Sequence, residues 1–243
     1  MTYCVAIKLR DGLLFASDTR TNAGVDHVAT FGKMRQLAEP GRIRLVLLSS
    51  GNLATSQSVA SLLELGVRGG DPATNILAVD SLYDAAVRLG ATLREVIARD
   101  ARPDEGTDFS SHFLLGGQVA GEAPRLFHVY PQGNFIEATR DTPYFQIGEA
   151  KYGKPILDRV LDYDTPRDEA IKCTLISFDS TMRSNLSVGA PLDLFWHPRD
   201  DFSAREPTRL AEHDPYLAGL REQWGRGLRQ AFATLPEPDW LAD

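Results

Sequence analysis

The sequence has few cysteines, no long apolar run and no excess of positive charge, and each shortage excludes a class of protein. Two cysteines, Cys4 and Cys173, are too few for a disulfide framework. No apolar run approaches the ~20 residues that a helix needs to cross a bilayer. The formal net charge of −7 argues against nucleic-acid binding, which usually requires basic clusters. Because no apolar leader opens the chain, we expect a cytoplasmic protein with no nucleic-acid or membrane partner.

Histidine is also sparse. The five histidines lie far apart along the chain, and none stands at a spacing typical of metal ligands. We therefore expect neither a metal nor a cofactor, so any chemistry has to come from the protein's own side chains. The length of 243 residues, of which 43% are hydrophobic, suffices for one large globular domain or at most two small ones.

The most informative stretch is the first 33 residues. Two β-rich runs, residues 3–8 and 13–18, are joined by Asp11-Gly12, which predicts a hairpin. Such a hairpin holds the N-terminus inside a sheet, where most chains let it fray. Removal of Met1, which is usual ahead of a small residue, would leave Thr2 with both a hydroxyl and a free α-amine.

Those two groups on Thr2 form a nucleophile and its base. The hydroxyl needs a base within hydrogen-bond reach, and an α-amine with a pKa near ~8 is partly neutral around pH 7. A nearby cation would lower that pKa further, and a carboxylate would hold the cation in place. Lys33 and Asp18 are the residue types for these two roles. The alternative is structural: Asp18 in a strand-ending turn and Lys33 as a solvated loop lysine.

These residues resemble a known family. Thr2, residues 16–24 and Lys33 are similar to the threonine, the D-S-R-x-x-x-G segment and the lysine of proteasome β-subunits and of the bacterial HslV peptidase. Residues 21–26 and 51–55, together with the long C-terminal tail, resemble most the bacterial proteasome-like family called Anbu. The resemblance covers roughly residues 2–197.

The resemblance implies a fold and a way of binding substrate. The fold would be α+β, a four-layer αββα sandwich of two antiparallel sheets, as in N-terminal-nucleophile hydrolases; hydrophobic periodicity makes such layers plausible but does not establish them. The residues Arg20, Thr21, Asn22 and Gly24 would pair as an added strand with an extended peptide substrate.

An acyl-transfer site also needs an N–H donor for the developing oxyanion. Gly51 stands between a strand predicted over residues 43–50 and a helix that Asn52 can cap. This turn is similar to the oxyanion turn of the family, so the N–H of Gly51 is the candidate donor. The alternative, a glycine required only by the turn, remains open.

The sequence departs from the proteasome pattern at two places. No serine follows Gly148 in residues 148–152, and the Asp-x-x-Ser pair before the final strand is replaced by residues 184–187. By resemblance Ser187 keeps its part, whereas Ser184 stands where the family has an aspartate. Those groups normally tune and hydrate the threonine.

The remaining pattern predicts helices and strands in blocks. Helices are expected over residues 55–66, from residue 73 to about 101, from residue 152, and from Thr165 as N-cap to about residue 185. Strands are expected over 33–37, over 111–117, 125–130, 135–139 and 144–148 as an antiparallel meander, and over 191–196. We expect one domain over residues 1–197, and a linker plus an amphipathic helix over residues 198–243.

The sequence therefore predicts a threonine peptidase or amidohydrolase that acts on peptide or amide substrates in a ring-like or helical homo-oligomer. Two alternatives remain open. The same acyl-enzyme could be resolved by an amine, which would make a transferase. The chain could also be a proteasome-like scaffold without catalysis. The sequence identifies no ATPase partner.

Overall fold

The computed structural model describes residues 2–22, 28–101 and 106–241. The chain divides into two compact units, Met1–Glu212 and His213–Asp243. The first unit extends past the expected boundary at residue 198, because residues 208–210 add a strand to one of its sheets.

The first sheet is built on the predicted hairpin. Its five strands are antiparallel and stand in the order β10-β1-β2-β11-β12. Every residue of β2 is buried, which explains the apolar run after the Asp11-Gly12 turn. The strands are β1 (Tyr3–Leu9), β2 (Gly12–Asp18), β10 (Tyr144–Gly148), β11 (Leu192–Pro198) and β12 (Thr208–Leu210).

The second sheet also has five antiparallel strands, in the order β5-β6-β7-β8-β9. They are β5 (Met34–Glu39), β6 (Ile43–Gly51), β7 (Ser111–Val119), β8 (Arg125–Val129) and β9 (Phe135–Glu137). A separate two-stranded ribbon, β3 (Arg20–Asn22) with β4 (Val28–Thr30), follows β2.

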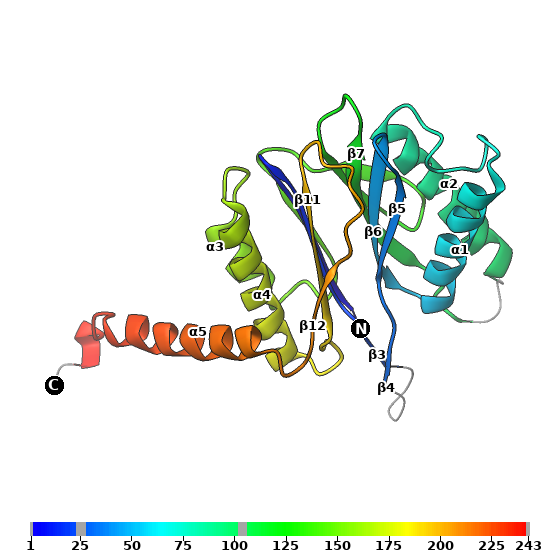
Figure 1. The fold of residues 1–243 in the computed structure, drawn as a ribbon. Helices are drawn as coiled ribbons and strands as arrows, with labels where there is room; N and C mark the ends of the chain where they lie inside the picture. The colour runs from blue at the N-terminus through cyan, green and yellow to red at the C-terminus, as the bar shows by residue number, and fades with distance from the viewer. Residues whose placement is uncertain (1, 23–27, 102–105, 242–243) are drawn as a thin grey trace. The chain divides into compact units, whose positions relative to one another are not determined.

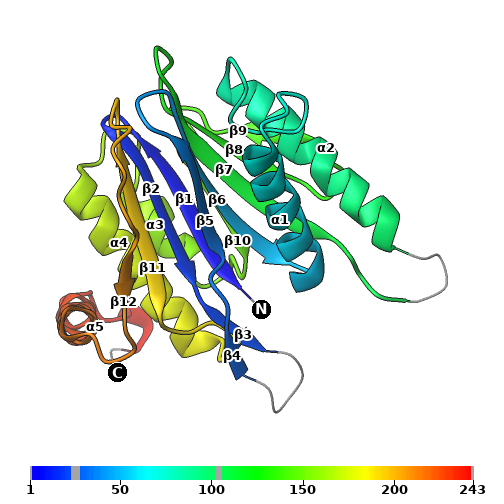
Figure 2. The same ribbon diagram turned by 45° about the vertical axis from the view of Figure 1, so that its right-hand side comes forward.

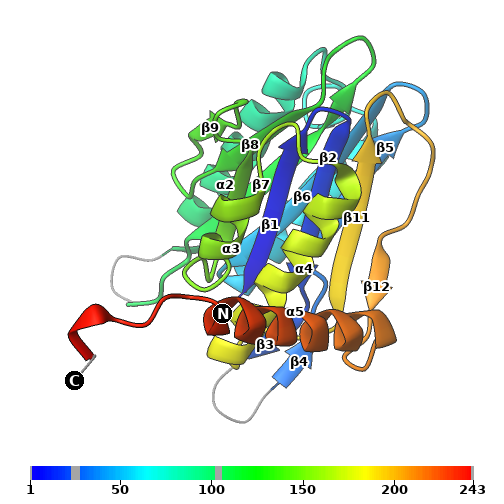
Figure 3. The ribbon, with the colours of Figure 1, turned by 90° about the vertical axis from the view of Figure 1, so that its left-hand side faces the viewer.

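Helices cover the outer faces of both sheets (Figures 1 and 2). The pair α1 (Leu53–Gly69) and α2 (Leu82–Asp100) lies on the second sheet. The pair α3 (Lys154–Val160) and α4 (Arg167–Ser184) lies on the first sheet, in front of β1, β2 and β11 in Figure 3. The inner faces of the sheets meet, so the unit is the expected α+β sandwich of four layers.

Each sheet buries side chains on both faces, because successive residues of a strand point to opposite sides. On β7, Leu114 packs between the two sheets with Cys4 and Phe15. Its neighbours Phe113 and Leu115 pack instead against the α1 and α2 side. On β7 the alternation produces one apolar core between the sheets and another under α1 and α2. The first sheet packs its outer face against α4, where Tyr3 contacts Phe178.

The start of α1 was predicted correctly from its N-cap, but the start of α2 was predicted wrongly. Asn52 caps α1 by accepting a hydrogen bond from the Thr55 N–H at 3.1 Å. The helix expected from residue 73 begins only at Leu82, after the N-cap Ser81. Asx turns precede it, in which the side chains of Asp71 and Asn75 accept backbone N–H groups at 2.9 Å.

Two further expectations need correction. The strand β10 does not close a meander with β9, because it crosses to the first sheet and pairs with β1. Thr165 is not the N-cap of α4: that position is taken by Pro166, with no side-chain cap. The Thr165 hydroxyl instead accepts the Asp162 N–H at 2.9 Å.

The second unit contains the helix α5 (Pro215–Ala233), which follows the N-cap Asp214 and lies in the stretch where the sequence predicts an amphipathic helix. The Asp214 carboxylate accepts the backbone N–H groups of Tyr216 and Leu217. A short 3₁₀ helix, Asp239–Leu241, follows. Across the part of the chain that the structure describes, no helix is long and apolar enough to cross a membrane.

Candidate active site

A buried ion pair joins the ends of two strands. Asp18, the last residue of β2, accepts a hydrogen bond from the Lys33 ammonium at 2.6 Å. Asp18 is fully buried and Lys33 is 7% exposed. Lys33 also donates to the carbonyl oxygen of Arg20 at 2.7 Å. The lysine is therefore not the solvated loop residue of the alternative interpretation.

Asp18 also fixes the backbone around it. The oxygen that binds Lys33 accepts the N–H of Tyr3 at 3.0 Å, and the other oxygen accepts the N–H of Gly189 at 3.4 Å. Burial raises the pKa of the Asp18 carboxyl, and the Lys33 cation opposes that rise. One carboxylate thus ties Lys33 to the residue that follows Thr2.

Thr2 stands directly before β1, and the peptide group that follows it is held from both sides. The carbonyl oxygen of Thr2 accepts the backbone N–H of Glu149 at 2.6 Å. The N–H of the same peptide group is the Tyr3 donor to Asp18. A Cβ on Gly148 would lie 2.0 Å from the Thr2 carbonyl oxygen, and Gly148 has a φ of +85°. Only glycine suits this close approach.

Glu149 and Ser187 belong to one chain of hydrogen bonds. The Glu149 carboxylate accepts the side-chain N–H of Asn185 at 2.9 Å and the backbone N–H of Lys151 at 3.2 Å. The Asn185 side-chain oxygen accepts the backbone N–H of Ser187 at 2.9 Å. The sequence singled out Ser187 but missed Glu149 and Asn185, which follow Gly148 and Ser184 directly.

Gly51 ends β6 with a φ of +104°, in the left-handed region. A Cβ there would meet the Ser110 carbonyl oxygen at 2.5 Å. The next N–H, that of Asn52, is bound to the same Ser110 oxygen at 2.9 Å. Backbone crowding and conformation therefore require glycine at the turn that leads into α1.

The residues expected to bind substrate lie on β3 or beyond it. The Arg20 guanidinium donates to the Leu186 carbonyl oxygen at 3.1 Å and crowds the position where Gly189 would carry a Cβ. Thr21 and Asn22 pair with Ala29 and Val28 of β4. Gly24 lies outside the described residues.

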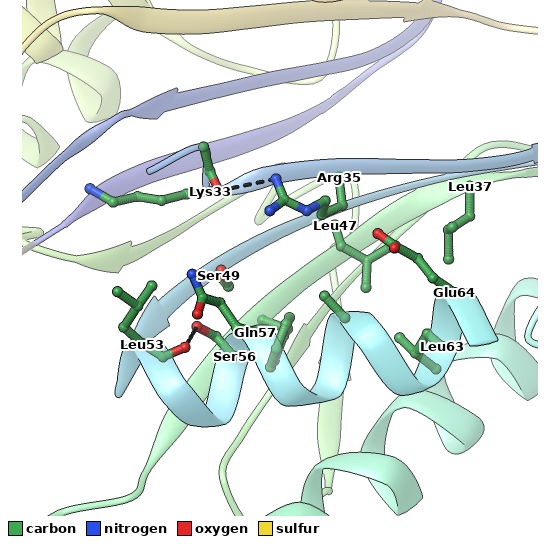
Figure 4. Close-up of a pocket in the computed structure, with 13 residues that line it drawn as sticks. Lys33, Arg35, Leu37, Leu47, Ser49, Leu53, Ser56, Gln57, Leu63 and Glu64 are labelled. Carbon is green, nitrogen blue, oxygen red and sulfur yellow. Dashed lines mark hydrogen bonds between the residues drawn. The ribbon is translucent and has the colours of Figure 1, made fainter. Parts of the chain in front are cut away.

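A cleft that the sequence did not predict opens beside Lys33, between α1 and the strands β5 and β6 (Figure 4). Its walls are largely apolar, with the charged side chains of Arg35 and Glu64 among them. The apolar and small lining residues are Leu37, Leu47, Leu53, Ala60, Leu63 and Phe113. Because they come from four separate elements, no local sequence pattern marks them.

The described residues form no cluster of metal ligands. Within residues 2–22, 28–101 and 106–241, no three or more His, Cys, Asp or Glu side chains gather so as to hold a metal ion. Two imidazoles, His112 and His128, share a hydrogen bond of 3.1 Å between their ring nitrogens.

The layers and strand order define the class of protein: this is a proteasome β-subunit-like chain. Its sequence is 26% identical over 191 residues to proteasome subunit beta 2 of Pyrobaculum neutrophilum, covering 78% of this chain and 85% of that one. No family model matches the sequence.

Solved structures narrow the class to a family. Anbu, the ancestral β-subunit, from Yersinia bercovieri is 59% identical, with a TM-score of 0.91 and 98% of each chain covered. The Anbu complex of Pseudomonas aeruginosa, solved as a helical assembly, is 52% identical, with a TM-score of 0.94 and coverage of 99% of this chain and 100% of that one. The chain belongs to the Anbu family.

Proposed function

We propose that this chain is a threonine peptidase or amidohydrolase, in which removal of Met1 exposes Thr2 as the nucleophile. The observation that carries the proposal is the shared carboxylate oxygen of Asp18, which binds both the Lys33 ammonium and the N–H that follows Thr2. That contact keeps a cation beside the threonine in a buried place, where its effect on a neighbouring amine is strong.

Acylation would use the two groups of Thr2 together. The Oγ attacks the carbonyl carbon of a peptide or amide bond, and its proton passes to the neutral α-amine. The carbonyl oxygen gains the electron pair, and the Gly51 N–H would donate a hydrogen bond to it. When the C–N bond breaks, the leaving amine takes the proton from the α-ammonium, and an ester remains on Thr2.

Deacylation would repeat these steps with water. The α-amine accepts a proton from water as its oxygen attacks the ester, and the proton returns to Oγ when the acid departs. If an external amine attacked instead, the product would be a new amide and the enzyme a transferase. Product analysis with and without added amine distinguishes the two outcomes.

Substrate binding would use β3 and the cleft beside Lys33. Among the described strands, β3 pairs only with β4, so its other edge can accept an extended peptide. The cleft next to Lys33 would receive the side chain that precedes the scissile bond. Its largely apolar walls suit an apolar side chain of that peptide.

We also propose that the chain works in a homo-oligomer. The second unit exposes Leu228, Phe232 and Trp240 at 50%, 77% and 83%. Large apolar side chains exposed together mark interaction surfaces, and the related complex of Pseudomonas aeruginosa is a helical assembly. The two cysteines are free and buried, which agrees with a reducing compartment such as the cytoplasm.

The test combines intact mass with a covalent threonine-directed inhibitor. We expect the purified protein to lack Met1 and to gain the mass of one inhibitor per chain on the peptide that begins with Thr2. The Thr2→Ala variant should remain unmodified. Full retention of Met1 in protein that still turns over a substrate would refute this mechanism. A processed chain that resists every such inhibitor would instead indicate a scaffold.

A further inference from the structure

Glu149 is a buried carboxylate with neutral hydrogen-bond partners. Its side chain is 8% exposed, and within the described residues its two oxygens accept hydrogen bonds from the Asn185 amide and the Lys151 N–H. No lysine, arginine or histidine of the described residues forms an ion pair with it. Burial of a carboxylate without a cation is costly, so this arrangement suggests a missing partner.

Glu149 and Lys33 lie toward opposite sides of the same peptide group. The N–H and C=O of a trans peptide point in opposite directions. The N–H, on Tyr3, binds Asp18 and so marks the side of Lys33. The C=O, on Thr2, binds the backbone of Glu149 and marks the other side. Thr2 is thus flanked along its backbone by Glu149 on one side and by the Asp18–Lys33 pair on the other.

The charge itself would come from the processed chain. Removal of Met1 creates an α-amine on Thr2, two covalent bonds from the carbonyl carbon whose oxygen binds Glu149. The Asn185 amide, at the C-terminal end of α4, binds the Glu149 carboxylate at 2.9 Å and so limits the positions that this side chain can take.

We propose that Glu149 is the anionic partner of the free α-amino group of Thr2, positioned by Asn185, and so replaces the serine that proteasome subunits carry after the equivalent of Gly148. The proposal rests on the proposed function for the site, but it concerns the amine, not the hydroxyl. Glu149 would orient the amine toward the threonine Oγ and stabilise its protonated form.

Glu149 and Lys33 then act on the amine with opposite signs. Lys33 disfavours a second cation and lowers the amine's pKa, whereas Glu149 raises it. Asp18 is the other charged side chain fixed to this backbone, and its charge is offset by Lys33. The packed helix α4 adds one further buried carboxylate, Asp179, which has partners of its own.

The test is a titration of the Thr2 amine that needs no catalysis. The full chain is released by a specific peptidase from an N-terminal ubiquitin-like fusion, so that it begins at Thr2. Trace labelling with acetic anhydride across pH, read on the N-terminal peptide by mass spectrometry, reports the pKa of the amine. We expect Glu149→Gln to lower that pKa by about 1 and Lys33→Met to raise it by about 1.

Two further variants exclude a purely structural role of Glu149 and a general effect of lost negative charge. Glu149→Asp keeps the charge and should retain most of the wild-type pKa, whereas a purely structural role would make Asp and Gln alike. Glu39→Gln removes one exposed carboxylate at the far end of β5 and should leave the amine unchanged. If Glu149→Gln does not fold, Asn185→Ala, which removes the amide that holds the carboxylate, is titrated instead, and an unchanged amine pKa in that variant overturns the proposal.

The titration tests the role of Glu149 independently of whether Thr2 is catalytic. A lowered amine pKa in Glu149→Gln, in a chain that no inhibitor acylates, supports Glu149 as the partner and refutes catalysis. Acylation of Thr2 with equal amine pKa values in wild type and Glu149→Gln supports catalysis and overturns the role of Glu149.

Discussion

Lys33 donates a hydrogen bond to Asp18 at 2.6 Å, and the oxygen that accepts it also holds the N–H of the residue after Thr2. Lysine and threonine are thereby coupled through one atom. Replacing Lys33 should therefore change the reactivity of Thr2, whereas replacing a lysine that does not contact Asp18 should not.

We expect Lys33→Ala to slow acylation of Thr2 by about 100-fold. Loss of the cation raises the amine's pKa, so the acid limb of the activity profile should move to higher pH. Asp18→Asn should give a milder form of both effects, because the lysine remains. Lys8→Ala, on β1 but bound to the Ala138 carbonyl, is the control. The rate of Thr2 acylation by an inhibitor is measured by mass spectrometry across pH for the wild type and the three variants. Equal rates in all four proteins would show that neither Lys33 nor Asp18 belongs to the site.

Gly51→Ala should cost more stability than an ordinary glycine replacement. The left-handed backbone alone costs about 1–2 kcal/mol for an alanine, and at Gly51 the new Cβ would also overlap the Ser110 oxygen. Gly70 has a φ of +70° and nothing within 4 Å, so Gly70→Ala isolates the backbone cost. Denaturant unfolding of both variants gives the comparison. Equal losses would mean that the turn at Gly51 has room to adjust.

Narrowing the cleft beside Lys33 should change which substrates acylate Thr2. Ala60→Leu adds bulk to the wall formed by α1, so inhibitors with a large apolar side chain should react about 10-fold more slowly. Inhibitors with a small side chain should be affected little. Ala54→Leu, on the exposed side of the same helix, serves as the control. An identical response of the two variants would exclude this cleft from substrate selection.

The protein should lose stability between pH 6.5 and 4 because of His197. This side chain is fully buried, neither ring nitrogen has a hydrogen-bond partner, and burial lowers its pKa to about 4. Arg44 lowers the pKa further, and Asp201 and Asp200 oppose this. The unfolded state therefore takes up the proton first as pH falls, at a cost to folding of up to about 3 kcal/mol.

His197→Leu should remove that part of the pH dependence and leave stability near pH 7 unchanged or raised, since no hydrogen bond is lost. Urea unfolding at a series of pH values makes the measurement. A slope that persists in the variant would assign the effect to other groups, such as His128, whose pKa is also lowered to about 4 by burial.

The exposed apolar face of α5 should support self-association. Phe232→Asp places a charge where a 77% exposed phenyl ring stands, and we expect it to weaken assembly at least 10-fold. Arg226→Ser on the same helix changes a polar position and should have little effect. Light scattering at micromolar concentration measures the mass, and a wild-type monomer would contradict the prediction.

The local parts of this fold were predictable because their signals lie within a few residues. Asp11-Gly12 marks the hairpin of β1 and β2, and Asn52 marks the start of α1. The place of β10 was not predictable, because its partner β1 lies at the other end of the domain sequence. The turns at Asp71 and Asn75 were overlooked because the surrounding residues have helical spacing.

The candidate site divides in the same way. Thr2, Asp18 and Lys33 could be assigned roles from residue type and order, and the structure brings Asp18 and Lys33 together. Their link through the Tyr3 N–H, the chain from Glu149 to Ser187 and the cleft beside Lys33 depend on residues that meet only after folding. Such contacts leave no periodic pattern in a sequence.

The clamped peptide group between Thr2 and Tyr3 has a practical consequence for anyone who purifies this protein. An affinity tag joined to the N-terminus would remain attached to the α-nitrogen of Thr2, where it converts the amine to an amide that cannot accept a proton at neutral pH. On the proposed mechanism, assays on such material would record an inert protein. A tag at the C-terminus leaves this nitrogen free, so the choice of vector decides whether the chemistry can be observed.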